Sequence, residues 1–545
     1  MSELETSEMQ QILDLISITQ SAAIELHKAC NINERSAFET LSDDIHMVYQ
    51  TITPLIKNSS KIRGLSLTCE SIVDSLKRIV ALFLFDRVKC SHKIEYELLP
   101  LIEIIYMNFY FYEIASKDEE LLKQYLEQDR FSLGANSYID DSEEAGIYKY
   151  DISICILAFN KLDYTKLCVE SLLKHIPKGL SYELILTNHG STDDTKSYFE
   201  SIAPHKQLDI LKNGGGFEAI MKIPEGQYIL SISNDILVTE NAIENMLACI
   251  KSDPLIAYVV PSTPNISNLQ AIPANYTSID EMYEFAAKNN QQNPLKWEQR
   301  TRLCDPIAML SSKHILSSEG ILPYTHKITG DDTFIFPDDK LAYFLRKKGL
   351  KMMLAKDAYC YHFGQVTIKD EVQSNDFYMN GRIAFHKTLK IDPWGKGFCY
   401  DFALFQNFNI QQKNDANILG VSSGMGSNPL KIKTLLRELG SKNTKLFLVT
   451  EEEHFQADYE SYTESSHIEI VPISKFSVAF PEEKFDYIIV EAHLSHSDVN
   501  SFKNRLRTAG KLLVWCANSE VIDSLQKSEF LETIPSNNGA WYIYS

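Results

Sequence analysis

Polar side chains that could do chemistry follow hydrophobic runs at five places in the middle of the chain. These segments read SICILAFNK at 153–161, ILTNHGSTDDT at 185–195, ILSISNDILVT at 229–239, PDDKLAYFLRKKG at 337–349 and YHFG at 361–364. Carboxylates can bind a divalent cation or accept a proton, and amides can hold a nucleobase or a phosphate. Because these groups occur in one ordered series, the sequence predicts a site that binds a nucleotide, neutralises its phosphates and deprotonates an acceptor.

The nucleotide contacts are expected in the loops that follow the first three runs. The predicted contacts are Phe159, Asn160, Asn188, Gly190, Ser191, Asn213, Gly215 and Asn234. Asn160 ends the first run, where its backbone and its amide can touch a nucleotide. The second loop also fits a capped helix start, with Ser191 or Asp193 as the cap. The loop Asn213-Gly214-Gly215-Gly216 lets backbone approach a ligand, or it forms a plain turn.

Asp235 and His362 are the candidate metal ligands. Asp235 ends a hydrophobic run, where it could bind Mg²⁺ or Mn²⁺ together with diphosphate oxygens. It could instead form a turn ahead of a helix capped by Thr239. His362 follows the run MMLAKDAYCY and could contact a metal or a phosphate, or have a structural role. The predicted cofactor is therefore Mn²⁺ or Mg²⁺.

Asp338 and Asp339 are the candidate catalytic residues. They open a helix that is rich in Lys and Arg and ends at Gly349. Acidic residues in a first helical turn are stabilised by the helix dipole, so helix capping is one interpretation. The other is a general base that takes the proton from an acceptor hydroxyl.

The runs that carry these loops alternate with helical patterns, which predicts a doubly wound α/β domain over residues 150–390. Ligands bind at the carboxyl ends of the strands in such sheets. Its first strands and helices are expected at 151–159, 164–176, 182–188, 194–203, 227–233 and 239–252.

Different patterns flank this domain on both sides. Residues 8–30, 36–57, 66–86 and 93–115 repeat apolar residues at helical spacing, which predicts a helical domain over 1–128. This domain could recognise the acceptor or form a homodimer. Strands and helices alternate again over 416–545, which predicts a second α/β domain.

Composition limits the class of partner. The net charge of −20 argues against nucleic-acid binding. The ten cysteines include no CxxC pair, so neither a zinc site nor a disulfide framework is indicated. The apolar stretch 98–115 carries Glu103, Asn108 and Glu113, which suits a buried helix better than a membrane span. With no signal-peptide core at the N-terminus, the sequence predicts a cytoplasmic protein without a transmembrane segment.

Residues 150–364 resemble the inverting GT-A glycosyltransferases of the large bacterial family two, whose members transfer sugars from UDP or dTDP donors. The resemblance implies a GT-A (nucleotide-diphospho-sugar transferase) fold, a UDP-sugar donor and a hydroxyl acceptor on a protein or a glycan. It implies that Asp338 is the base, with Asp339 the close alternative, and that Asp235 binds the metal. Asn188 stands where the family usually has aspartate, and Pro337 where it has glutamate. The segments 257–270 and 296–303 are similar to a subgroup that acts in flagellin, S-layer or surface-polysaccharide glycosylation.

The C-terminal segment resembles S-adenosylmethionine-dependent methyltransferases, with a Rossmann-like fold. ILGVSSGMG at 418–426 is similar to their nucleotide loop, and Glu451 stands where they hold the ribose. Gly420 and Ser422 depart from the loop pattern, and some terminal strands of a full domain are expected to be missing. A degenerate, non-methylating module is the main interpretation. A bifunctional enzyme with methyltransferase activity and a non-catalytic scaffold are the alternatives.

Overall fold

The computed structural model describes most of the chain from residue 148 onward and one N-terminal helix. The described ranges are 6–30, 131–133, 148–210, 224–312, 337–347, 349–364, 391–492, 496–517, 530–536 and 539–545, with single positions at 50, 53, 76, 77, 79, 90, 94, 98, 102, 109, 314, 366, 382, 383 and 385. Helix α1 (Thr6–Cys30) confirms the first predicted helix, and the other three predicted N-terminal helices lie almost entirely outside the described residues.

The chain divides into two compact units. The first comprises Met1–Leu237, Pro306–Pro337 and Gln365–Lys390, and the second comprises Val238–Asp305, Asp338–Gly364 and Ile391–Ser545.

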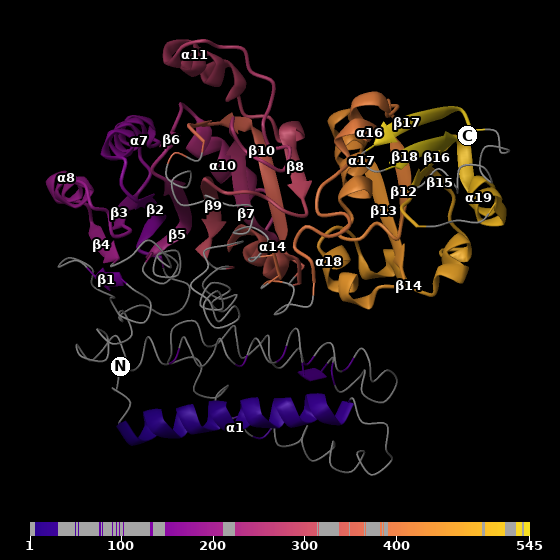
Figure 1. Cartoon of the computed structure of the whole chain (residues 1–545), viewed down its shortest axis with the longest axis horizontal. Helices are drawn as coiled ribbons and strands as arrows, with labels where there is room; N and C mark the ends of the chain where they lie inside the picture. Colours follow the sequence, from indigo (N-terminus) through magenta and orange to yellow (C-terminus); the bar gives the residue numbers. More distant parts are fainter. Residues whose placement is uncertain are drawn as a thin grey trace. The chain divides into compact units, whose positions relative to one another are not determined.

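The first unit contains a mostly parallel sheet with strand order β1-β4-β3-β2-β5-β9. Strands β2, β3, β4 and β5 are parallel, whereas β1 and β9 join the sheet antiparallel. The bounds are β1 (Phe131–Leu133), β2 (Tyr150–Ala158), α7 (Leu162–His175), β3 (Tyr182–Asn188), α8 (Thr195–Ile202), β4 (Lys206–Ile210), β5 (Gly226–Ser233), β6 (Ile236–Leu237) and β9 (Ile307–Ser311). Figure 1 shows α7 and α8 beside this sheet. The central strands form because β-branched and aliphatic runs are buried on both faces, as parallel sheets require.

Register brings the predicted nucleotide loops to one edge of this sheet. Ala158, the last residue of β2, pairs with Asn188 at the end of β3, and Leu157 pairs with Ser233 at the end of β5. The carboxyl ends of the three strands therefore lie at the same level, as the sequence predicts. Asn160, Ser191 and Asn234 follow directly from these ends.

The second unit begins with three strands in the order β7-β10-β8, which belong to a nine-stranded sheet. Strand β10 is parallel to β7 and antiparallel to β8, and α10 and α11 pack on it. The bounds are α10 (Ala242–Lys251), β7 (Ile256–Ser262), α11 (Ile279–Asn289), η5 (Pro294–Lys296), β8 (Trp297–Arg300), α14 (Pro337–Lys347), β10 (Lys351–Tyr359) and β11 (Tyr361–His362).

The same unit ends in a seven-stranded sheet of order β14-β13-β12-β15-β16-β18-β17. Its strands and helices are α16 (Phe402–Asn407), β12 (Asp415–Val421), α17 (Ser427–Glu438), β13 (Asn443–Thr450), η6 (Glu453–Phe455), α18 (Gln456–Glu460), η7 (Ser465–His467), β14 (Ile468–Ile470), η8 (Ile473–Val478), β15 (Phe485–Val490), α19 (His496–Lys503), β16 (Leu506–Cys516), β17 (Glu532–Ser536) and β18 (Gly539–Tyr544). Helix α17 packs on β12 and β13 (Figure 1). The antiparallel strands β17 and β18 correct the expectation of missing terminal strands.

Candidate functional site

Two loops at the edge of the first sheet are bound to each other through Asn160. The Asn160 backbone NH donates to Ser191 Oγ at 2.8 Å, and the Asn160 side-chain oxygen accepts from the Thr192 NH at 2.8 Å. Asn160 and Lys161 both have positive φ, which asparagine tolerates better than most residues. Ser191 therefore binds the neighbouring loop, and it does not cap α8. Asp193 Oδ1 accepts from the Thr195 NH at 3.1 Å, but the N-cap position of α8 is Asp194, so the predicted cap at Ser191 or Asp193 is wrong.

The side chains of Asn188 and Asn234 are hydrogen-bonded to the same two loops. Asn188 Oδ1 accepts from the Ser191 NH at 3.0 Å, and its Nδ2 donates to Asp209 Oδ1 at 3.0 Å. Asn234 Nδ2 donates to the Asn160 carbonyl at 3.0 Å and to Thr165 Oγ1 at 2.9 Å. Asn188, Ser191 and Asn234 thus have their polar atoms engaged within the protein. Each amide keeps a further lone pair, so a ligand contact remains compatible with these bonds.

The remaining predicted nucleotide contacts have simpler surroundings. Phe159 is half-buried beside Asn160, and Gly190 has φ +71°, a conformation that suits glycine at this turn. Asn213 and Gly215 lie outside the described residues.

Asp235 follows Asn234 at the end of β5 and is buried, with 3% of its surface exposed. Within the described ranges, no three His, Cys, Asp or Glu side chains are grouped as a metal site. A single carboxylate still suits Mg²⁺, because that ion keeps several waters and is commonly held by one or two carboxylates plus substrate phosphates. The donor set fits a cation that arrives with a diphosphate, and it does not fit a resident metal cage.

One detail of the predicted metal region is corrected. The helix after Asp235 begins after Asn241, and the Thr239 hydroxyl donates to the Tyr359 carbonyl, so Thr239 is not its side-chain cap. His362 belongs to the second unit, where it is buried and its carbonyl accepts from Asn265 Nδ2 at 2.9 Å. Asp235 belongs to the first unit.

His189 follows Asn188 and is buried, and its ring nitrogen Nε2 has no contact with solvent. Its backbone NH donates to the Ala158 carbonyl at 2.8 Å, and its Nε2 has no hydrogen-bond partner among the residues that the structure describes. Burial lowers the pKa of His189 to about 4. The imidazole is therefore neutral at physiological pH.

Acid is expected to destabilise the protein through His189. Its folded pKa lies below the unfolded value of about 6.5, so its contribution to stability is complete above pH 6.5 and is lost as pH falls toward 4. Between pH 7 and 4 we expect the wild type to lose about 2 to 3 kcal/mol more unfolding free energy than His189→Asn, measured by urea unfolding. Equal losses in the two proteins would show that His189 does not titrate in this way.

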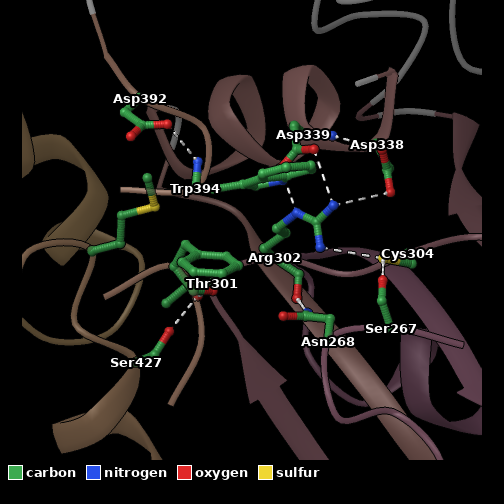
Figure 2. Close-up of polar contacts among 12 residues, drawn as sticks. Ser267, Asn268, Thr301, Arg302, Cys304, Asp338, Asp339, Asp392, Trp394 and Ser427 are labelled. Carbon is green, nitrogen blue, oxygen red and sulfur yellow. Dashed lines mark hydrogen bonds and ion pairs between the residues drawn. The ribbon is translucent and has the colours of Figure 1, made fainter. Parts of the chain in front are cut away.

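Arg302 holds both candidate catalytic carboxylates in the second unit (Figure 2). Its Nε and Nη2 donate to the two oxygens of Asp339, the latter at 3.0 Å, and its Nη2 lies 3.7 Å from Asp338 Oδ2. The Asp339 side chain is 2% exposed, whereas that of Asp338 is 18% exposed. Asp339 is thus the buried partner of a two-pronged ion pair, and Asp338 is the carboxylate that remains open to an incoming group.

A third carboxylate, Asp305, adds to this group. Burial and the negative charge of Asp338 raise the pKa of Asp305 well above its usual range. The same two causes raise the pKa of Asp339 to about 7, although the ion pair with Arg302 opposes the shift. Arg302 is paired with Asp338 and Asp339, and its positive charge also opposes the upward shift in the pKa of Asp305.

Sequence reasoning did not identify Arg302 or Asp305 as site residues. Both lie in or just after the segment 296–303, which the sequence singled out only for a family resemblance. The repeated basic residues of QRTRL provided a signal, but Asp339, the partner of Arg302, lies 37 positions away in the sequence.

Comparisons with known proteins agree with the family resemblance of the central segment. Residues 153–314 match the model of glycosyl transferase family 2. The chain is similar to a crystal structure of GalNAc-T7 with UDP, GalNAc and Mn²⁺, at 13% identity and a TM-score of 0.33, over 44% of this chain and 48% of that one. It is also similar to the mannosyltransferase PcManGT from Pyrobaculum calidifontis in complex with GDP-Man and Mn²⁺, at 12% identity and a TM-score of 0.29, over 64% and 81%.

The chain thus spans about half the length of the first of these structures. No curated protein sequence matches it. In the part of the chain that the structure describes, no helix is both long enough and apolar enough to cross a membrane. The family match identifies the central segment as a glycosyltransferase domain.

Proposed function

We propose that the protein is a metal-dependent inverting glycosyltransferase that moves a sugar from a UDP-sugar to a hydroxyl of a protein or glycan. The observation that carries this proposal is the family match over residues 153–314, which contains the three linked loops and Asp235. The acceptor class, in flagellin, S-layer or surface-polysaccharide glycosylation, follows from the resemblance of segments 257–270 and 296–303.

The proposed donor site is at the carboxyl edge of the first sheet. Asn160, Asn188 and Asn234 fix the shape of its loops through bonds between segments that lie 21 to 74 positions apart. We propose that these three residues place backbone groups against the nucleotide. Their amide side chains can also form further hydrogen bonds to it. Preformed loops lower the ordering cost of binding, which favours affinity.

Asp235 is the proposed ligand of Mg²⁺ or Mn²⁺, with His362 as a further candidate contact. When bound, the cation would supply positive charge to the diphosphate leaving group. Asp235 would hold that charge beside the donor loops, since it follows Asn234 directly.

Asp338 is the proposed general base. Its partly exposed carboxylate takes the proton of the acceptor hydroxyl, and the hydroxyl oxygen forms a bond to the anomeric carbon. The bond from that carbon to the diphosphate oxygen breaks, the diphosphate leaves with the electron pair, and the configuration inverts. Arg302 keeps Asp338 in place and holds Asp339 beside it.

A screen of nucleotide sugars tests the proposal. A specific donor raises the melting temperature by mass action, and we expect the largest rise with one UDP-sugar in the presence of Mn²⁺. The same donor should be hydrolysed or transferred, and EDTA should abolish turnover. Absence of both stabilisation and turnover across UDP-, dTDP- and GDP-sugars would contradict the proposal.

A further inference from the structure

A buried ion-pair cluster joins the C-terminal sheet domain to the helix that carries the candidate base. Asp458, which follows η6 in the C-terminal domain, has no exposed surface. Arg346 Nε donates to its Oδ1 at 2.8 Å, and Lys347 Nζ donates to its Oδ2 at 2.7 Å. Both cations lie on α14, two turns after Asp338. The positive charges of Lys347 and Arg346 outweigh burial and lower the pKa of Asp458.

Arg346 also holds the chain beside Arg302. Its Nη1 donates to the carbonyl of Thr301, the residue before Arg302. The Thr301 hydroxyl is hydrogen-bonded to Ser427 Oγ of α17 at 2.6 Å, as Figure 2 shows. Polar contacts therefore run from Asp458 through Arg346 to the Thr301 carbonyl, and Thr301 is the chain neighbour of Arg302, which pairs with both carboxylates.

A second cluster fixes the strand that leads to Arg302. Glu298 of β8 is buried and accepts from Lys431 of α17 at 2.8 Å, with Arg300 at 3.1 Å and Lys356 at 3.3 Å. Burial alone would raise the pKa of Glu298, but these three cations lower it to about 2. Helix α17 of the C-terminal domain is thus bound to β8 by an ion pair whose carboxylate stays ionised at physiological pH.

The glycine loop at 418–426 of the C-terminal domain and the start of α17 are hydrogen-bonded to another segment of the same chain. The Met425 NH donates to the Lys396 carbonyl at 2.9 Å, and the Ser427 NH donates to the Gly397 carbonyl at 3.3 Å. Gly397 and Gly424 both have positive φ, and a Cβ on Gly397 would lie 2.7 Å from Met425 N. Backbone donors that could face an anionic ligand at the start of α17 are therefore occupied by the connecting segment 395–398.

We propose that the C-terminal domain positions the catalytic base, and that Asp458 is a positioning residue acting through Arg346. The inference rests on the proposed function, because Asp338 is a base only if the protein transfers sugar. Removal of the Asp458 charge frees Arg346 from its anchor. The Thr301 carbonyl and Arg302 then lose their fixed place, and the carboxylates shift relative to the acceptor.

Asp458→Asn with Asp486→Asn as matched control tests this role. Asp486 is another buried aspartate of the C-terminal domain, paired with Lys413 at 2.7 Å and Arg507 at 2.9 Å, and neither partner lies on α14. The two substitutions each remove one buried charge from two cations. We expect Asp458→Asn to lower kcat about tenfold to a hundredfold with the donor KM nearly unchanged, since small misplacements have such costs. Asp486→Asn should retain kcat per folded molecule.

Two further readouts separate positioning from loss of folded protein. The groups that face Asp339 are Asp338, Arg302 and Arg346. With Arg302 less firmly held, the acidic limb of the kcat profile should move to higher pH in Asp458→Asn, whereas a smaller active fraction lowers kcat equally at every pH. Hydrogen exchange in α14 should rise in Asp458→Asn and stay unchanged in Asp486→Asn.

The result that overturns the proposal is equal behaviour of the two variants in kcat, pH profile and exchange of α14. If Asp458→Asn does not fold, Arg346→Lys gives the same test, because lysine keeps the charge but cannot reach Asp458 and the Thr301 carbonyl together. Wild-type protein without turnover contradicts the proposed function, and the exchange measurement then still decides whether Asp458 holds α14.

Discussion

Asp338→Asn is expected to lower sugar transfer about a hundredfold to ten-thousandfold, the range that a general base contributes. Asparagine keeps the size of the side chain and one acceptor oxygen, but it cannot accept the proton of the acceptor hydroxyl. The 18% exposure of Asp338 and its 3.7 Å distance from Arg302 leave it available to an acceptor. Initial rates at saturating donor and acceptor measure the loss, and donor affinity should stay near that of the wild type.

Asp339→Asn is the matched control, because it alters the neighbouring carboxylate on the same helix. Asp339 is the buried partner of Arg302, so this change should mainly cost stability, about 3 kcal/mol for breaking one side of a buried pair. If Asp338→Asn keeps its turnover while folded Asp339→Asn has none, the base is Asp339 and the assignment is wrong by one residue.

Asp235→Asn is expected to lower transfer at least about a hundredfold, because a bound cation contributes several kcal/mol to the stabilisation of a leaving group. The amide keeps the shape of this buried position but removes the negative charge that favours the cation. The rate at fixed donor, measured over a range of Mn²⁺ concentrations, should show that more Mn²⁺ is needed for half-maximal activity.

Asp151→Asn is the control for this prediction. Asp151 is exposed near the start of β2, at the opposite end from the donor loops, and accepts from the Ser181 NH at 2.9 Å. It should leave both the rate and the Mn²⁺ dependence unchanged. An unaltered Mn²⁺ dependence in Asp235→Asn would remove Asp235 from the metal site.

Local signals explain what the sequence predicts correctly about the fold. The run YELILTN forms β3 with the expected bounds, and DISICILAF forms β2 within one residue at each end. These runs are apolar, β-branched and bounded by turn residues, so their conformation depends little on distant parts of the chain. The loop residues Asn160, Asn188 and Asn234 were predicted for the same reason, since each ends such a run.

Long-range pairing explains what the sequence could not show. The Arg302–Asp339 ion pair joins residues 37 positions apart, and the Arg346–Asp458 ion pair joins residues 112 positions apart. Nothing local in the sequence distinguishes Asp339 as a buried ion-pair partner from Asp338 as the more open carboxylate. The hydrogen bonds between the glycine loop and residues 395–398 are likewise tertiary contacts. The sequence motif resembles a ligand-binding loop and does not reveal them.

The most direct test is a crystal structure of Asp338→Asn with the intact UDP-sugar and Mg²⁺. The account predicts the cation at about 2.1 Å from an Asp235 oxygen, with diphosphate oxygens as further ligands. It also predicts that the side chain at position 338 faces the anomeric carbon from the side opposite the diphosphate. A cation bound away from Asp235, or position 338 turned away from the sugar, would contradict the account.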